Sequence, residues 1–370
     1  MRNAIREYLE LKENEKQNLW ENATFVFDTN VFLNLYRYSP KTREQLVNAF
    51  EQLSDRVWMP YQVAYEFSKN RCEIIYEANE RFQRLKSDAD KMINSWKEEL
   101  RADSSDEDVK ELDEYLQQWI EKKEAKNRLI TNPNEDSVLD KLLELFDGKV
   151  GQAFSKDEIA NIEQEGEKRY ANSVPPGYKD KKKVENKYGD LFVWKEILRF
   201  AKDNKKDIIF VIHDQKEDWW NQLHGKTIGP RVELRKEFYE QTNQKFHMYS
   251  MSSFLSTFGK HIGETIDTET IDEVELFSYV LKQKAYKEEL NQYYENFDDE
   301  KEKRAAQIRF EIARLENKNR KRENVIANLY TENGKRPLKN KKRQYLENNE
   351  INLEKDKRKI ERLLDELAML

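Results

Sequence analysis

The sequence has little of several residue types that mark particular classes of protein. Its 370 residues include one cysteine, Cys72, which excludes an intrachain disulfide and cysteine-rich zinc sites. The longest clean apolar run, Ile208 to Ile212, is far below the ~20 residues of a membrane span. The first twenty residues carry mixed charge and lack the apolar core of a secretory signal. We therefore expect a soluble cytoplasmic protein without membrane contact.

Glycine and proline are also scarce, and charge is abundant. The 10 Gly and 7 Pro leave few interruptions, which favours long helices. Charged and hydrophobic residues each make up 37%, and 18 Tyr, 18 Phe and 7 Trp supply side chains large enough to build a core. The net charge of −6 is small but unevenly distributed. The length suggests two to three domains.

Apolar strand-like runs alternate with helical patterns in two parts of the chain. The predicted strands are residues 24–27, 56–60, 208–212 and 245–251, and the run at 208–212 is fully apolar, as in a buried parallel sheet. A helix is expected to begin near Tyr61 and to carry Glu66. Strands that alternate with helices predict an α/β fold with a parallel sheet.

A coiled-coil-like pattern interrupts this α/β pattern. Apolar residues at spacings of three and four residues predict two helices separated by an acidic hinge at 103–108. The predicted seams are Phe82, Leu85, Ala89, Met92 and Trp96, then Val109, Leu112, Leu116 and Trp119. They form either the core of an antiparallel hairpin or a surface for self-association or a protein partner.

The chain reads as helical from about Gly263 to its end. One apolar stripe contains Ile308, Ile312 and Leu315, and the other contains Ile360, Leu363, Leu364 and Leu367. A basic stretch at residues 301–343, which includes the first stripe, holds 15 bases and 5 acids, and Gly334 and Pro337 interrupt it. This basic stretch either follows a nucleic-acid backbone or is the solvated face of a helical bundle.

Acidic residues stand at successive junctions between strands and helices. Asp28 and Asp214 follow buried strands, Asp190 opens a helix, and Asp218 would lie one turn after Asp214 if a helix began there. Ligands bind at the carboxyl edge of a parallel sheet, so these acids can converge with Glu66 on one cleft. Converging carboxylates require a cation, and Mg²⁺ or Mn²⁺ prefers oxygen ligands. Each acid alone can instead cap a helix or form a turn.

Four segments together resemble the motifs of PIN-domain nucleases. Phe25-Val-Phe-Asp-Thr-Asn-Val-Phe-Leu is similar to the first motif, and Pro60-Tyr-Gln-Val-Ala-Tyr-Glu66 to the second. Tyr188-Gly-Asp190-Leu-Phe-Val-Trp resembles the third, and Phe210-Val-Ile-His-Asp214-Gln-Lys-Glu-Asp218 the fourth. The segment 175–180, Pro-Pro-Gly-Tyr-Lys-Asp, resembles a feature of a larger bacterial PIN-like subfamily with a helical insertion.

The resemblance implies a fold and a set of roles. The fold would be an α/β, PIN-like parallel-sheet sandwich at residues 1–80 and 170–260. A helical-hairpin insertion at 81–169 would interrupt it, and an all-helical, partly coiled-coil domain at 261–370 would follow. Asp28, Glu66, Asp190 and Asp214 would be the catalytic, metal-binding acids. Asn30 would orient Asp28 or a metal-bound water, and Asp218 or Glu217 would be an outer metal ligand.

A lysine-rich loop leads directly to Asp190. Residues 168–189 contain 7 bases and 2 acids, interleaved with three tyrosines. Lysines with aromatics suit single-stranded nucleic acid, and the alternative is a solvated loop. The candidate nucleic-acid contacts are Tyr178, Lys179, Lys181, Lys182 and Lys183.

The family resemblance favours hydrolysis of single-stranded or structured RNA with Mg²⁺ or Mn²⁺. Single-stranded or structured DNA is an alternative substrate, because nothing in the sequence recognises a 2′-hydroxyl. An inactive PIN-like scaffold that binds a protein through its long helices is the other alternative. The subfamily resemblance also suggests a toxin or antiviral defence effector that acts as a homo-oligomer or with a partner protein such as an ATPase.

Overall fold

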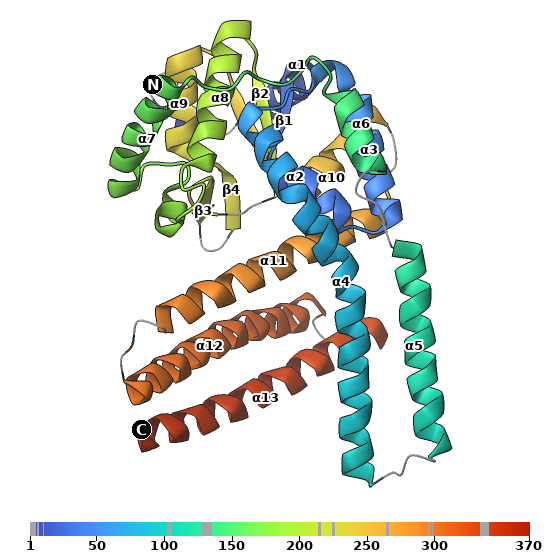
Figure 1. Cartoon of the computed structure of the whole chain (residues 1–370). Coiled ribbons are helices and arrows are strands. Elements are labelled where there is room, and N and C mark those ends of the chain that lie inside the picture. The colour runs from blue at the N-terminus through green and yellow to red at the C-terminus, as the bar shows by residue number, and fades with distance from the viewer. Residues whose placement is uncertain are drawn as a thin grey trace. The chain divides into compact units, whose positions relative to one another are not determined.

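The computed structural model describes residues 5, 7–9, 11–101, 106–127, 135–213, 216–223, 226–263, 266–294, 297, 299–333 and 340–370 (Figure 1). The chain forms two compact units, Met1–Tyr279 and Val280–Leu370. The three-part domain division expected from the sequence stays a prediction. Among the described residues, no helix is both long enough and apolar enough to cross a membrane.

The first unit mixes helices with five short strands. Its elements through the insertion are α1 (Glu13–Asn22), β1 (Thr24–Phe27), α2 (Thr29–Leu33), η2 (Asn34–Tyr36), α3 (Pro40–Gln52), η3 (Ser54–Arg56), α4 (Tyr61–Leu100), α5 (Glu107–Asn127) and α6 (Ser137–Leu145). They continue with α7 (Lys156–Ala171), η4 (Tyr178–Lys182), α8 (Gly189–Asn204), β2 (Ile208–Ile212), β3 (Trp220–Leu223), β4 (Lys226–Pro230), α9 (Val232–Thr242), β5 (Phe246–Ser250) and α10 (Met251–Ile262). Helix α11 (Thr268–Tyr294) begins in this unit.

A parallel three-stranded sheet with the order β1-β2-β5 organises this unit, as the sequence predicts. Strands β1 and β2 are buried at every position, so both faces of the sheet are covered along them. Thr24 pairs with Ile208, and Ile208 pairs with Phe246, so the carboxyl ends of all three strands reach the same edge. That edge is where an α/β sheet binds its ligands.

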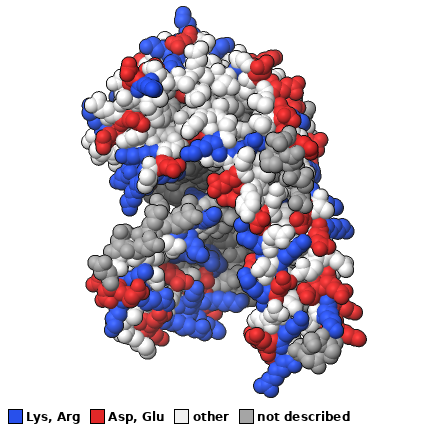
Figure 2. All heavy atoms as spheres, in the orientation of Figure 1, with Lys and Arg blue, Asp and Glu red and all other residues white. Residues whose placement is uncertain are grey.

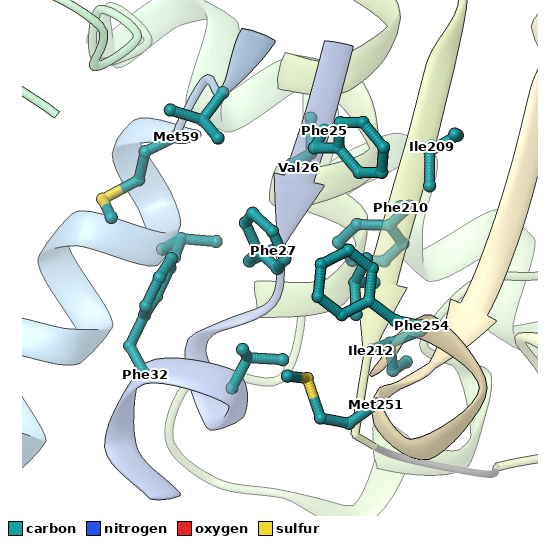
Figure 3. Close-up of a cluster of buried hydrophobic side chains, with 14 of the residues drawn as sticks. Phe25, Val26, Phe27, Phe32, Met59, Ile209, Phe210, Ile212, Met251 and Phe254 are labelled. Atoms are coloured by element: carbon teal, nitrogen blue, oxygen red, sulfur yellow. The ribbon is translucent and has the colours of Figure 1, made fainter. Parts of the chain in front are cut away.

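Alternate side chains point to opposite faces of the sheet. Phe25 and Phe27 pack on Phe254 of α10, with ring centroids 6.0 and 5.5 Å apart (Figure 3). On the other face Phe210 contacts Trp219, with ring centroids 5.2 Å apart. Both faces are therefore sealed by aromatic rings, and only the strand ends remain for chemistry.

Two features of the sheet differ from the sequence prediction. The expected strand at 56–60 is reduced to two isolated bridges, Phe25 with Val57 and Met59 with Val150. The extended segment is too short to form a continuous ladder before Tyr61 begins α4. The sequence also gave no indication of the antiparallel pair β3–β4, which follows β2 where a helix was one expectation.

Helix α4 is longer than the sequence prediction of separate elements. It runs without interruption from Tyr61 to Leu100, so one element carries Glu66 near its start and one arm of the insertion at its far end. Residues 61–100 contain neither glycine nor proline, and this absence is the signal for continuity. Residues 103–105 of the expected hinge at 103–108 lie outside the described residues.

The insertion forms a hairpin of α4 and α5 with its own small core. Phe82 and Ala89 of α4 pack with Ile120 of α5, and Leu116 lies against them. Several residues of the predicted seam have exposed fractions of 37–46%. On α4, the residues that are buried instead lie at positions 82, 89 and 93. These exposed residues are Leu85, Met92, Trp96, Leu112 and Trp119.

The second unit contains the last part of α11 together with α12 (Glu300–Asn333) and α13 (Asn340–Met369). The predicted stripes meet: Ile308, Ile312 and Leu315 pack with Leu363, while Leu364 is half exposed. Bases of the predicted basic stretch pair with acids of α13, including Arg322 with Asp356. These pairs agree with the bundle-face alternative for this stretch. Gly334 and Pro337 lie outside the described residues.

Candidate metal and nucleic-acid site

Asp28 stands at the carboxyl end of β1 and also begins α2. Its backbone N–H donates to the carbonyl oxygen of Val211 at 2.9 Å, which extends the β1–β2 pairing by one residue. Its side chain accepts from the backbone N–H and the side-chain Nδ2 of Asn30, both at 3.4 Å. Asp28 is therefore a helix cap, and Asn30 lies where it can orient the carboxylate.

Glu66 lies beside the start of α2, on the first turns of α4. Thr29 Oγ1 donates to Glu66 Oε2 at 2.8 Å, and Oε1 accepts from Gln62 Nε2 at 2.8 Å and Asn186 Nδ2 at 2.7 Å. A side chain at Gly189 would place its Cβ 2.7 Å from Glu66 Oε1, so the glycine before Asp190 permits this close approach. Neutral donors hold Glu66 in place beside the position that follows Asp28.

Asp190 occupies the first turn of α8 and is the electrostatic centre of the acid cluster. Burial raises the pKa of Asp190 to about 8; Lys216 opposes the shift, while Asp180, Asp218 and Asp28 add to it by charge repulsion. Its side chain keeps 27% exposure, so solvent still reaches the carboxylate. The charges of three acids, from η4, the turn before β3 and the end of β1, therefore act on the carboxyl group of Asp190.

Asp180 is an acid that the sequence analysis did not identify as part of the site. Its side chain is 12% exposed and accepts from Lys216 Nζ at 3.1 Å (Oδ1) and 3.2 Å (Oδ2). Gly177 begins the turn of η4 that carries Asp180 at a positive φ of 85°, and a Cβ there would overlap the Tyr170 hydroxyl. The sequence signal was a single acid within a run of lysines directly after that glycine.

Buried ion pairs fix the start of the same loop. Arg169 forms a two-pronged pair with Glu237 of α9 at 2.8 and 2.7 Å, and also donates to the carbonyl oxygen of Pro175. Trp194 Nε1 donates to the same Glu237 carboxylate at 3.0 Å. The contact with Pro175 ties α7, α9 and the approach to Asp180 into one network.

Asp218 lies in a turn before β3 rather than on a helix. It is fully buried, and its Oδ2 accepts from the backbone N–H of Lys179 at 3.2 Å. Glu217 points to the rim, where its Oε1 pairs with Lys179 Nζ at 2.8 Å and stays half exposed. Of the two alternatives for an outer ligand, Asp218 is the one that acts on the Asp190 pKa.

Asp214 and Gln215 lie outside the described residues, so the role of the fourth predicted acid stays a prediction. Within the described residues, which omit Asp214, no group of three or more His, Cys, Asp or Glu is arranged to hold a metal ion. The donor chemistry of the cluster nevertheless fits a hard cation, because every candidate ligand is a carboxylate. Burial is the main cause of the raised pKa of Asp190, and charge repulsion from Asp180, Asp218 and Asp28 adds to it, so further positive charge beside Lys216 would favour the ionised carboxylate.

The candidate nucleic-acid residues lie on the loop beside this cluster. Lysine and arginine side chains gather on the surface over the loop that follows α7 (Figure 2). Lys179 and Lys183 form ion pairs with Glu217 and Asp180 at 2.8 and 2.7 Å. Lys181 and Lys182 are exposed, and Tyr178 is partly buried.

An open pocket of about 440 Å³ lies elsewhere in this unit. It is lined by residues that include Thr24, Trp58 and Lys149. Thr24 is the first residue of β1, so this pocket lies at the amino end of the strand and not at the end that carries Asp28. The acid cluster is therefore the candidate site.

Comparison with known proteins identifies the family. A family model described as PIN like domain matches residues 24–234, more than half of the 370 residues. The chain therefore belongs to the PIN-like domain family, which confirms the resemblance of the four motifs. No curated protein and no solved structure gives a significant match. Members of this family are typically nucleases that use divalent metal ions and bind nucleic acid, so the chain has a nuclease-type domain.

Proposed function

We propose that this member of the PIN-like family is a metal-dependent endonuclease that hydrolyses phosphodiester bonds in single-stranded or structured RNA. The observation that supports the proposal is that one ammonium group, Lys216 Nζ, lies 3.1 Å from Asp180 and 4.0 Å from Asp190, and that the charges of Asp28, Asp180 and Asp218 also act on Asp190. Asp28 directly follows β1, Asp180 and Asp190 lie on neighbouring elements η4 and α8, and Asp218 lies in the turn before β3. Repulsion between carboxylates lowers the stability of the fold, so an arrangement of this kind indicates a functional site.

Mg²⁺ or Mn²⁺ would supply an activated water and would stabilise the charge that develops on the phosphate. Asp28, Glu66, Asp190 and Asp214 would hold the cation, with Asp218 as an outer ligand. Asn30 orients the Asp28 carboxylate through its Nδ2. Thr29, Gln62 and Asn186 fix Glu66 by hydrogen bonds, which limits its freedom to turn away from the site.

The loop from Tyr178 to Lys183 would position the RNA. Lys181 and Lys182 are exposed next to η4, where they can contact phosphates. Tyr178 can stack on a base, a contact that tolerates any sequence. Lys179 and Lys183 would have to exchange their internal ion pairs for phosphate contacts, so we assign them a smaller share of the binding energy.

The test compares cleavage of matched RNA and DNA single strands with Mn²⁺, Mg²⁺ or EDTA. Asp28→Asn is a well-suited inactive variant, because asparagine still caps α2 and the fold is retained. Asp203→Asn, an exposed change on the same helix as Asp190, is the matched control. We expect metal-dependent RNA cleavage by the wild type and the control, and none by Asp28→Asn.

Other outcomes select the alternatives. Metal-dependent cleavage of DNA alone would make DNA the substrate. Cleavage of neither polymer, together with no binding of Mn²⁺ to the wild type, would favour the inactive scaffold.

On the subfamily resemblance alone, we further propose a toxin or antiviral defence role that a partner protein such as an ATPase, or self-association, controls. Expression of the wild type in a bacterial host should then arrest growth, and expression of Asp28→Asn should not. Equal growth of both strains, at equal protein levels, would argue against an unrestrained toxin.

A further inference from the structure

A lysine side chain lies within the acid cluster. Lys216 follows β2 closely, and its Nζ lies 3.1 and 3.2 Å from the two carboxylate oxygens of Asp180. The same Nζ is 4.0 Å from Asp190 Oδ2. One ammonium group therefore bridges acids from two segments, η4 and α8, that the fold brings together.

This position differs from that of an ordinary surface ion pair. Lys183 also contacts Asp180, at 2.7 Å, but it is a local partner three residues away and its side chain is 55% exposed. The Lys216 side chain is 30% exposed, and it connects elements more than thirty residues apart in the chain. Its positive charge also lowers the pKa of Asp190 against the effect of burial.

An ammonium group and a divalent cation satisfy carboxylates in different ways. Lysine provides a compact single charge on a tethered stem, whereas Mg²⁺ and Mn²⁺ bring two charges and demand several oxygen ligands. Asp180 already directs both of its oxygens toward Lys216. A metal ion that used Asp180 would have to displace this lysine from the cluster.

We propose that Lys216 is a built-in cation that replaces a second metal ion, so that the site binds a single divalent ion. The inference rests on the proposed metal-dependent function and adds its stoichiometry. Lys216 holds Asp180, and Asp28 and Asp190 are left to the exchangeable ion. Lys216 is accordingly a positioning residue, which shapes the charge of the site without taking part in bond breaking.

The test counts Mn²⁺ ions on the purified full-length chain by calorimetry and by electron paramagnetic resonance. The wild type should bind one ion with the signal of an isolated Mn²⁺. Lys216→Met removes the charge but keeps the length of the side chain, and it should bind two ions with a spin-coupled signal. Lys216→Arg should restore one ion, and Lys183→Met, which removes the other lysine at Asp180, should stay at one.

Each outcome separates this inference from the proposed function. Two coupled ions on the wild type would overturn the inference and leave a metal-dependent nuclease. One ion on both the wild type and folded Lys216→Met would also overturn it. No ion on the wild type would overturn the inference and the proposed metal dependence together. If Lys216→Met fails to fold, the number of Mn²⁺ ions bound by Lys216→Gln replaces it in the comparison with the wild type, and the same outcomes support or overturn the inference.

Discussion

Glu196 of α8 is a buried carboxyl group near the candidate site, and its protonation can be tested through the pH dependence of stability. Its side chain is 2% exposed, and its Oε2 accepts from the backbone N–H of Gln62 at 3.2 Å. It thereby satisfies a donor at the start of α4, where Pro60 provides no side-chain cap. Burial raises the pKa of Glu196 from 4.5 to about 7, against the lowering effects of Gln62 and Arg199.

The shift sets the sign and size of a pH effect. Because the folded pKa lies above the unfolded value, the folded chain binds this proton more tightly and loses stability as pH rises from about 4.5 to about 7. At about 1.4 kcal/mol per pKa unit, the loss from this one group approaches ~3 kcal/mol by pH 8. Glu196→Gln stays neutral and can still accept from Gln62, so it should avoid this loss.

Urea unfolding followed by circular dichroism at several pH values between about 5 and about 8 measures this effect. We expect Glu196→Gln and the wild type to be similarly stable near the lower limit, and the variant to be more stable near the upper limit by up to ~3 kcal/mol. Glu99→Gln, an exposed change on α4, should track the wild type at every pH. Parallel profiles for Glu196→Gln and the wild type would refute the assignment of a buried, protonated carboxyl group.

Three further variants, two single and one double, test the loop that carries Asp180. Gly177→Ala places a side chain at a positive φ and against the Tyr170 hydroxyl. We therefore expect the free energy of unfolding to fall by ~1–3 kcal/mol and the cleavage rate to fall more steeply. Unfolding and cleavage equal to the wild type would refute the need for glycine at this position. Arg169→Met leaves a buried carboxylate without its main partner and should cost ~3–5 kcal/mol in urea unfolding; a cost below ~1 kcal/mol would mean that solvent screens the pair. The double variant Lys181→Ala/Lys182→Ala should reduce the slope of log K against log salt for single-stranded RNA by about 1.4, measured by fluorescence anisotropy; an unchanged slope would place the phosphates elsewhere.

Periodicity and strand-end chemistry predicted the sheet and most of the acids. The run of β2 is apolar at every position, β1 is apolar after its first residue, and β5 alternates buried with partly buried positions, so all three strands were visible in the sequence. Asp28 and Asp190 illustrate this, because each lies at the end or the start of an element that the sequence pattern predicts.

Asp180 and the β3–β4 hairpin show where the sequence was not sufficient. Asp180 lies in a run of lysines that reads as a solvated loop, and its inward direction depends on Gly177, on Lys216 and on the tether of Arg169 to Pro175. These contacts join residues up to 36 positions apart, which no local pattern encodes. The β3–β4 hairpin was not predicted for a similar reason. Its first residue, Trp220, is buried through contacts with the rest of the fold, and the sequence around it has no alternation of apolar and polar residues that would indicate a strand.

The continuity of α4 links the candidate site to the insertion. A helix of 40 residues is about 60 Å long at 1.5 Å per residue, and its hydrogen bonds run unbroken from the turn of Glu66 to the hairpin. The hairpin core of Phe82, Ala89 and Ile120 is separate from the core around the sheet. A partner that bound to the hairpin or moved it would therefore leave the packing of the sheet intact. A force on its far end would still act on the same helix that presents Glu66. The hydrogen bonds of Thr29 and Asn186 to Glu66 are the contacts that a displacement of this helix would alter at the candidate site.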